Sequence, residues 1–136
     1  MKEEKIPVEL LIQKAIEMLD YSYSPYSNFK VGAALLTKEG EIYTGCNIEN
    51  AAYGPSNCAE RTAVFKAVSE GKRDFAAIAI VGGHEGKIEN YCSPCGVCRQ
   101  VLAEFCKADF KVIMAKSSSD YKIQTLGELL PLSFSL

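Results

Sequence analysis

The N-terminal part of the chain has the apolar spacing of an amphipathic helix. Between positions 8 and 19, apolar residues recur at intervals of three and four, which places them on one helical face: Val8, Leu11, Ile12, Ala15, Ile16 and Leu19. Pro7 suits the start of this helix, because the N–H that proline lacks would have no partner in the first turn. The pattern predicts a helix that packs on a core.

The pattern then changes to that of β-strands. Positions 31–37 and 41–46 predict the two strands of a hairpin, joined by a turn that contains Gly40. Positions 75–81 are almost continuously apolar, as expected of a strand that is covered on both faces. Further strands are expected at 110–115 and, as a short one, at 121–124.

Helices are expected between these strands. One spans about 58–71, where Gly71 suits the end, and another spans 95–106. Positions 125–130 have the pattern of a capped helical turn, and the connections at 21–29, 47–57 and 82–94 are rich in turn-forming residues. This alternation predicts an α/β fold with three α/β/α layers, in which helices cover both faces of a mixed five-stranded sheet.

Length and composition are those of an ordinary globular protein. The 136 residues are 48% apolar and 24% charged, and they contain no repeat or linker, so one domain is expected over 1–136. The net charge of -2 provides no basic surface for long nucleic acid, which argues against a polynucleotide partner.

The location is expected to be cytoplasmic. The charged segment 1–5 leads directly into the amphipathic pattern, so no signal peptide is visible, and the apolar run 75–81 is too short to span a bilayer. In a reducing compartment, six cysteines favour roles as metal ligands, catalytic groups or packing residues over disulfides.

Three cysteines are spaced for a metal site. Cys95 and Cys98 are three residues apart at the start of a predicted helix and therefore share one face, and Cys58 stands at the start of another helix. If the two helix N-termini meet, three thiolates could bind one zinc ion per chain and leave the fourth tetrahedral position to water, as in catalytic zinc sites. Arg61 and Arg99 could donate hydrogen bonds to the sulfurs and offset their negative charge.

Glu60 completes this predicted site, because it lies two residues from Cys58 and can face the same cavity without binding metal. A carboxylate beside activated water can take up its proton and pass it to a leaving group.

Other metal sites explain the cysteines less well. A structural zinc ribbon needs a second cysteine pair, which Cys58 does not have, and an iron–sulfur run through Cys92 would need a cysteine where Leu102 stands. Cys92 could replace one zinc ligand, although it precedes Pro94 and lies off the predicted helix. A non-catalytic zinc-stabilised binding module would need neither Glu60 nor an open coordination position.

The segments Cys58-Ala59-Glu60 and Pro94-Cys95-Gly96-Val97-Cys98 resemble the paired motifs of the cytidine deaminase family, specifically its small homotetrameric branch. The resemblance extends from Tyr26-Ser27 through positions 47–52 to Leu130-Pro131. Many related deaminases have histidine in place of Cys58, and the cysteine points to the small nucleoside enzymes. The resemblance implies zinc-dependent hydrolysis of cytidine and 2′-deoxycytidine to the uridines, with release of ammonia, in pyrimidine salvage.

The resemblance also implies individual roles. Asn47 and Glu49 would bind ribose hydroxyls, and Glu60 would carry protons from water to N3 and then to the leaving amino group. The remaining contacts would come from Phe29, packed against the nucleoside; Ala59, at the pyrimidine edge with Glu60; Ala51 and Tyr53, lining the site; and Phe134, reaching a neighbouring subunit. From the residues alone, Asn-x-Glu suits hydroxyl recognition, although solvated loop residues are the more common explanation, and Phe134 could be a terminal core residue.

Rival functions share some of these features. A blasticidin S-type deaminase has the same zinc motifs, but the Asn47 and Glu49 pair speaks against it; nucleic-acid editing is disfavoured by the missing basic surface. Of the other reactive residues, His84 is expected in a solvated loop, and Cys46 and Cys106 are expected as small apolar packing groups.

Overall fold

The computed structural model describes residues 6–136. The charged segment 1–5, on which the expected lack of a signal peptide rests, lies outside the described residues. Within the described range, no helix has both the length and the apolar character needed to cross a membrane.

The centre of the molecule is a mixed sheet of five strands, as predicted. The spatial order is β2-β1-β3-β4-β5, in which β3 and β4 are parallel and every other neighbouring pair is antiparallel. The strands are β1 (Phe29–Thr37), β2 (Ile42–Cys46), β3 (Phe75–His84), β4 (Lys111–Ser117) and β5 (Asp120–Thr125).

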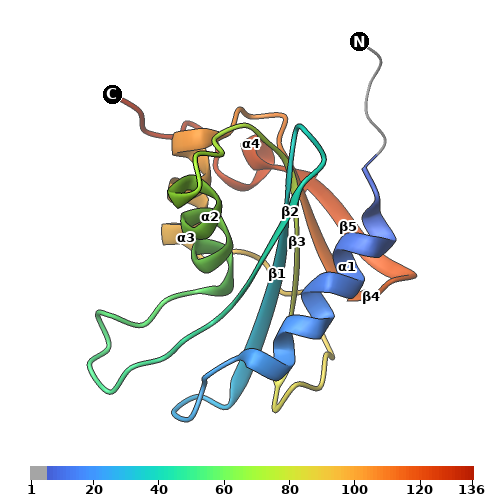
Figure 1. The fold of residues 1–136 in the computed structure, drawn as a ribbon, viewed down its shortest axis with the longest axis vertical. Helices are drawn as coiled ribbons and strands as arrows, with labels where there is room; N and C mark the ends of the chain where they lie inside the picture. Colours follow the sequence, from blue (N-terminus) through green and yellow to red (C-terminus); the bar gives the residue numbers. More distant parts are fainter. Residues whose placement is uncertain (1–5) are drawn as a thin grey trace.

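Helices cover both faces of this sheet, which confirms the three-layer prediction. Figure 1 shows α1 (Val8–Glu17) on one face and α2 (Ala59–Ser69) with α3 (Gly96–Phe105) on the other. The α3 helix makes the crossover that a parallel pair of strands requires, here between β3 and β4. The short α4 (Leu126–Leu129) begins with a capping box between Thr125 and Glu128, in line with the predicted capped turn.

The two faces of the sheet belong to two apolar clusters. Along β1, Leu35 packs in the cluster of α2 and α3, whereas Leu36 packs in the cluster of α1. The β3 strand likewise contributes Ile78 to the first cluster and Ala79 to the second. Because side chains alternate along a strand, the continuous apolar run of β3 is the pattern of a strand buried on both sides.

The structure changes several predicted boundaries. The first helix is α-helical only to Glu17, and its predicted last turn is the 3₁₀ helix η1 (Met18–Tyr21), in which Leu19 remains buried. The strands β1 and β3 are longer than predicted, because they pair with each other as far as Phe29 and His84. Cys58 and Cys95 precede their helices as N-caps instead of lying in the first turn.

Gly45 allows the start of α2 to approach β2 very closely. A Cβ atom at this position would lie 2.4 Å from the carbonyl oxygen of Ala59 and 2.6 Å from the backbone nitrogen of Ala63. Backbone atoms cannot swing aside as side chains do. The contact therefore sets how close the N-terminus of α2 lies to the sheet.

We predict that Gly45→Ala lowers the free energy of unfolding by about 1–3 kcal/mol, because the extra methyl group overpacks the contact between β2 and α2. Chemical denaturation monitored by circular dichroism measures the change. Gly54→Ala is the matched control, since a Cβ atom there meets no neighbour within 4 Å. Equal losses in the two variants would contradict the prediction.

Candidate active site

Three cysteine sulfurs converge where α2 and α3 begin. The Sγ atoms of Cys58, Cys95 and Cys98 all lie within 4.8 Å of one another. The sulfurs of Cys58 and Cys95 are 3.6 Å apart, and those of Cys95 and Cys98 are 3.4 Å apart. The three residues predicted as metal ligands thus form one compact group.

The helix N-termini explain why these sulfurs can meet. Cys58 and Cys95 have extended backbone at the N-cap positions of α2 and α3, and the Sγ of Cys95 accepts a hydrogen bond from the backbone N–H of Cys98 at 3.4 Å. The first N–H groups of a helix have no partner within the helix and carry partial positive charge. Both effects place positive charge beside a sulfur at this position.

The donor set fits zinc. Zinc binds thiolates at about 2.3 Å, so tetrahedral geometry separates two bound sulfurs by about 3.8 Å, close to the separations observed. Three protein ligands also leave one position of the tetrahedron open, as in catalytic sites. Among the described residues, Cys92 lies outside the convergent group, and burial raises the pKa of its thiol to about 12.

Arg61 supplies positive charge beside these sulfurs. Its guanidinium donates a hydrogen bond to the Sγ of Cys58 at 3.3 Å. Hydrogen bonds from the thiol of Cys98 and from Arg61 lower the pKa of Cys58 to about 5. The pKa of Cys98 is raised correspondingly, because its thiol donates to Cys58. The predicted contact of Arg61 with a ligand sulfur is present in the structure.

Arg99 makes different bonds from those expected. Its Nε donates to the carbonyl oxygen of Pro94 at 2.8 Å, and its Nη1 donates to the carbonyl oxygen of Leu129 at 2.7 Å. The side chain therefore ties the segment before Cys95 to the end of α4. Arg99 thus stabilises the loop before Cys95 through bonds to backbone carbonyl groups. The expected hydrogen bond from Arg99 to a cysteine sulfur is not present among the described residues.

A cavity of about 830 Å³ opens beside the sulfurs, a volume suited to a small molecule. Glu60 is among its lining residues and is only 4% exposed. Burial is the main cause that raises the pKa of Glu60 to about 7, and the negative charge of Cys58 adds to it. A carboxyl group with such a pKa can both take up and release a proton near neutrality.

A second carboxylate in the cavity is held in place by a loop. Glu49 accepts hydrogen bonds from the backbone N–H groups of Tyr26 at 3.0 Å and Ser27 at 3.1 Å, and also from the hydroxyl of Ser27. The hydroxyl is the main cause that lowers the pKa of Glu49 below its usual value. Glu49 therefore presents a negative charge at a defined place in the cavity.

Most of the predicted site residues line this cavity. Its lining includes Asn47, Glu49, Tyr53, Cys58, Ala59, Glu60, Arg61 and Cys95. Phe29, Ala51 and Phe134 are not among the lining residues of this cavity. Phe134 is 67% exposed, and its carbonyl oxygen accepts a hydrogen bond from the side chain of Gln100 at 3.1 Å.

Other lining residues were not predicted from the sequence. They come from β1, from the first turn of α3 and from the loops that precede β1, α2 and α3: Tyr26, Ser27, Val31, Asn50, Gly54, Ser56, Asn57, Cys92, Ser93 and Val97. Tyr26, Ser27 and Asn50 lie in segments that carry the family resemblance, which could have indicated them. Val31 is an ordinary apolar strand residue, and no sequence signal distinguishes it.

A family of known proteins matches most of this chain. The sequence model of the cytidine and deoxycytidylate deaminase zinc-binding region matches residues 6–115. The chain belongs to this family. The matched residues contain all three convergent cysteines and Glu60.

Relatives with known names cover nearly the whole chain. A cytidine deaminase of Sporosarcina psychrophila is 52% identical over 94% of this chain and 91% of its own length. The crystal structure of a cytidine deaminase from Burkholderia pseudomallei is 45% identical, with a TM-score of 0.86, and covers 95% of this chain and 100% of that one. A blasticidin-S deaminase of Bacillus cereus is 30% identical over 92% of this chain and 90% of its own length. The fold and the zinc-binding region are those of the family.

We predict that Arg61→Met weakens zinc binding by about tenfold or more, because the sulfur of Cys58 loses its charged donor. Competition with a chromogenic zinc chelator measures the affinity. Arg73→Met is the control, since Arg73 is an exposed arginine just beyond α2. An unchanged affinity in Arg61→Met would show that the hydrogen bond does not support the metal.

Proposed function

We propose that the chain is a zinc-dependent hydrolase that deaminates cytidine and 2′-deoxycytidine to uridine and 2′-deoxyuridine and releases ammonia. The observation that carries this proposal is the buried carboxyl group of Glu60, which lines the same cavity as the sulfurs of Cys58 and Cys95. Membership of the deaminase family and the names of the similar proteins support the same reaction.

The proposed zinc ligands are Cys58, Cys95 and Cys98, which would hold one zinc ion per chain. When bound, zinc supplies Lewis-acid activation of water. The N-caps of two helices and the guanidinium of Arg61 balance the negative charge of three thiolates. Arg99 keeps the loop before Cys95 in place.

Glu60 moves the protons. Its carboxylate accepts a proton from the attacking water and delivers a proton to N3 of the base, which makes C4 more electrophilic. It then takes the second proton from the oxygen that has become bound to C4 and delivers it to the exocyclic amino group, which leaves as ammonia. The oxygen of water remains on C4, so that cytidine and water give uridine and ammonia. The raised pKa of Glu60 suits a group that must both accept and release protons.

The other end of the cavity suits the sugar. Asn47 and Glu49 provide an amide and a carboxylate on one loop, and these are groups that can donate to and accept from ribose hydroxyls. Ala59, at the N-terminus of α2, would offer its backbone to the pyrimidine edge, and Tyr53 would lie beside the nucleoside. Phe29 and Ala51 remain part of the proposal through the family resemblance alone.

The blasticidin-S deaminase of Bacillus cereus makes an antibiotic substrate the main alternative. The nucleoside is favoured here because Glu49 carries its charge in the cavity and is oriented by three hydrogen bonds. The reaction is also proposed to take place in the cytoplasm, since a thiolate zinc site needs reduced cysteines and the six cysteines of the described residues are all free.

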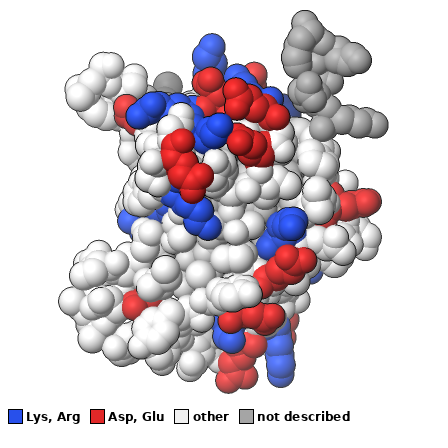
Figure 2. All heavy atoms as spheres, viewed as in Figure 1, with Lys and Arg blue, Asp and Glu red and all other residues white. Residues whose placement is uncertain are grey.

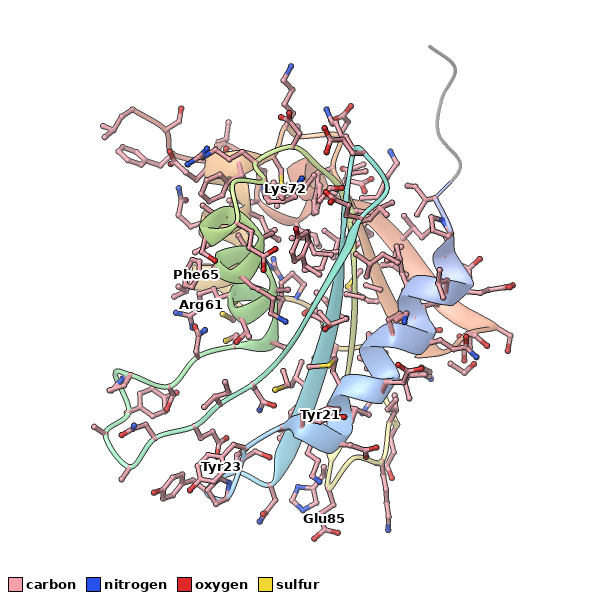
Figure 3. All side chains as sticks on the ribbon, in the orientation of Figure 1. Tyr21, Tyr23, Arg61, Phe65, Lys72 and Glu85 are labelled. Atoms are coloured by element: carbon pink, nitrogen blue, oxygen red, sulfur yellow. The ribbon has the colours of Figure 1, made fainter. Side chains whose placement is uncertain are left out.

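A homotetramer is proposed as the working assembly. Figure 3 shows Arg61 and Phe65 projecting from α2 on the side that faces away from the sheet. Phe65 is 49% exposed there, and the nearby helix α3 exposes Val97. Figure 2 shows a lobe of the surface with little charge, on the side where Figure 1 has the 47–57 loop. Within positions 47–57, Glu49 is the single charged residue. Apolar, weakly charged surfaces of this kind favour contacts between subunits, where Phe134 could reach a neighbouring site.

We predict that Glu60→Gln retains zinc but loses at least about a hundredfold in turnover, because an amide cannot shuttle protons. The decrease in ultraviolet absorbance of cytidine measures turnover, and metal analysis measures zinc. Glu70→Gln is the matched control, because Glu70 is an exposed carboxylate at the far end of the same helix. Near-normal turnover in Glu60→Gln would refute the proton-shuttle role.

We predict that the purified protein sediments with four times the mass of the chain and that Phe65→Lys shifts it to smaller species, because a charge would be buried at the interface. Analytical ultracentrifugation measures both. Lys66→Ala, at an exposed neighbouring position, should leave the assembly unchanged. A wild-type protein that sediments as a single chain would refute the tetramer.

A further inference from the structure

The side chain of Asn47 is bound to the backbone of β1. Its Oδ1 accepts a hydrogen bond from the backbone N–H of Val31 at 2.9 Å, and its Nδ2 donates to the carbonyl oxygen of Phe29 at 2.8 Å. An N–H group must face an oxygen, and a carbonyl must face an N–H group. These two backbone contacts therefore determine which end of the carboxamide is oxygen and which is nitrogen.

Ser22 makes a third bond to this carboxamide. Its hydroxyl contacts both the Oδ1 of Asn47 and the hydroxyl of Ser24. The hydroxyl of Ser22 is the donor in both contacts, and because it has only one proton, its principal hydrogen bond is the shorter one, to the Oδ1 of Asn47. Ser24 is 7% exposed, so its hydroxyl needs a partner inside the protein. Ser22 thus lies between Ser24 and Asn47, and Asn47 accepts its principal hydrogen bond.

Backbone hydrogen bonds hold the segment 22–24 against the loop that carries Asn47 and Glu49. The N–H of Tyr23 donates to the carbonyl oxygen of Asn47 at 3.0 Å, and the N–H of Glu49 donates to the carbonyl oxygen of Tyr23 at 2.8 Å. The segment 22–24 therefore lies beside 47–49 and forms one isolated parallel β-bridge, between Tyr23 and Ile48. Figure 3 shows Tyr21 and Tyr23, which flank Ser22, at the end of the molecule where η1 leads toward β1.

These contacts leave the Asn47 amide with one uncommitted hydrogen. Both lone pairs of Oδ1 are used, by Val31 and Ser22, and one of the two Nδ2 hydrogens is used by Phe29. Within residues 6–136, the second Nδ2 hydrogen has no protein acceptor, and Asn47 lines the cavity. The side chain thus offers a ligand a single donor in a single direction.

We propose that Ser22 is a positioning residue for sugar recognition: its hydroxyl donates to the Oδ1 of Asn47 and holds the carboxamide so that the free N–H faces a sugar hydroxyl. This rests on the proposed function, in which Asn47 binds the ribose. Ser22 does not line the cavity and acts only through Asn47. An oriented donor loses less freedom on binding than a mobile one, so the contribution of Ser22 belongs to substrate affinity.

The test compares two substrates that differ in the sugar alone. Steady-state kinetics are measured for wild type, Ser22→Ala, Ser22→Thr and Ser119→Ala, with cytidine and with 2′,3′-dideoxycytidine, which lacks both ribose hydroxyls of the sugar ring. Ser22→Ala should raise KM for cytidine about fivefold, the worth of one hydrogen bond, with kcat nearly unchanged and no effect on the dideoxynucleoside. Ser22→Thr keeps the hydroxyl and should restore KM, and Ser119→Ala, which is exposed in the β4–β5 turn, should match wild type.

A second measurement needs no substrate. The Nδ2 hydrogens of Asn47 give a pair of NMR signals, and Ser22→Ala should broaden or shift them, whereas Ser119→Ala should not. Equal loss with both substrates, no loss with cytidine, or unchanged Asn47 signals would overturn the inference. A wild-type enzyme that does not deaminate cytidine, with Asn47 signals that still respond to Ser22→Ala, would instead overturn the proposed function and with it the assignment of the sugar as ligand.

Discussion

The convergence of two helix N-termini on three cysteine sulfurs is the constraint on which the site depends. Like-charged thiolates repel one another, so the arrangement needs positive charge close by. The partial charges of α2 and α3 and the guanidinium of Arg61 provide it. The sheet in turn fixes where the helices begin, because the close contact of Gly45 with Ala59 sets the height of α2 above β2.

The same helix start gives Glu60 its chemistry. A residue two positions after Cys58 lies in the first turn of α2, where the sheet and the cavity wall bury it to 4% exposure. Burial disfavours the charged form of a carboxyl group and so raises its pKa toward neutrality. One structural feature, the start of a helix on a sheet, therefore both assembles the metal ligands and prepares the proton carrier.

The sugar end of the cavity is built in another way. Its polar groups lie on a loop, and a loop residue has many accessible orientations unless its hydrogen bonds are satisfied. Glu49 is oriented by Tyr26 and Ser27, and Asn47 is oriented by the backbone of β1 and by Ser22. The side chains proposed to recognise the sugar are therefore oriented by hydrogen bonds with residues that are distant in sequence.

The elements of the fold and the chemical groups of the site could be predicted from the amino-acid sequence. Apolar periodicity gave five strands and the main helices, because burial on one or both faces leaves a repeating pattern in the chain, and the spacing of Cys95 and Cys98 with Cys58 and Glu60 predicted the metal site. Sequence could not predict that Arg99 bonds to the carbonyl of Leu129 or that Ser22 reaches Asn47. Those contacts join segments that are far apart in the sequence. Strand order and register bring the segments together, and these depend on the folding of the whole chain, so the sequence pattern alone does not show which side chains come within hydrogen-bond distance.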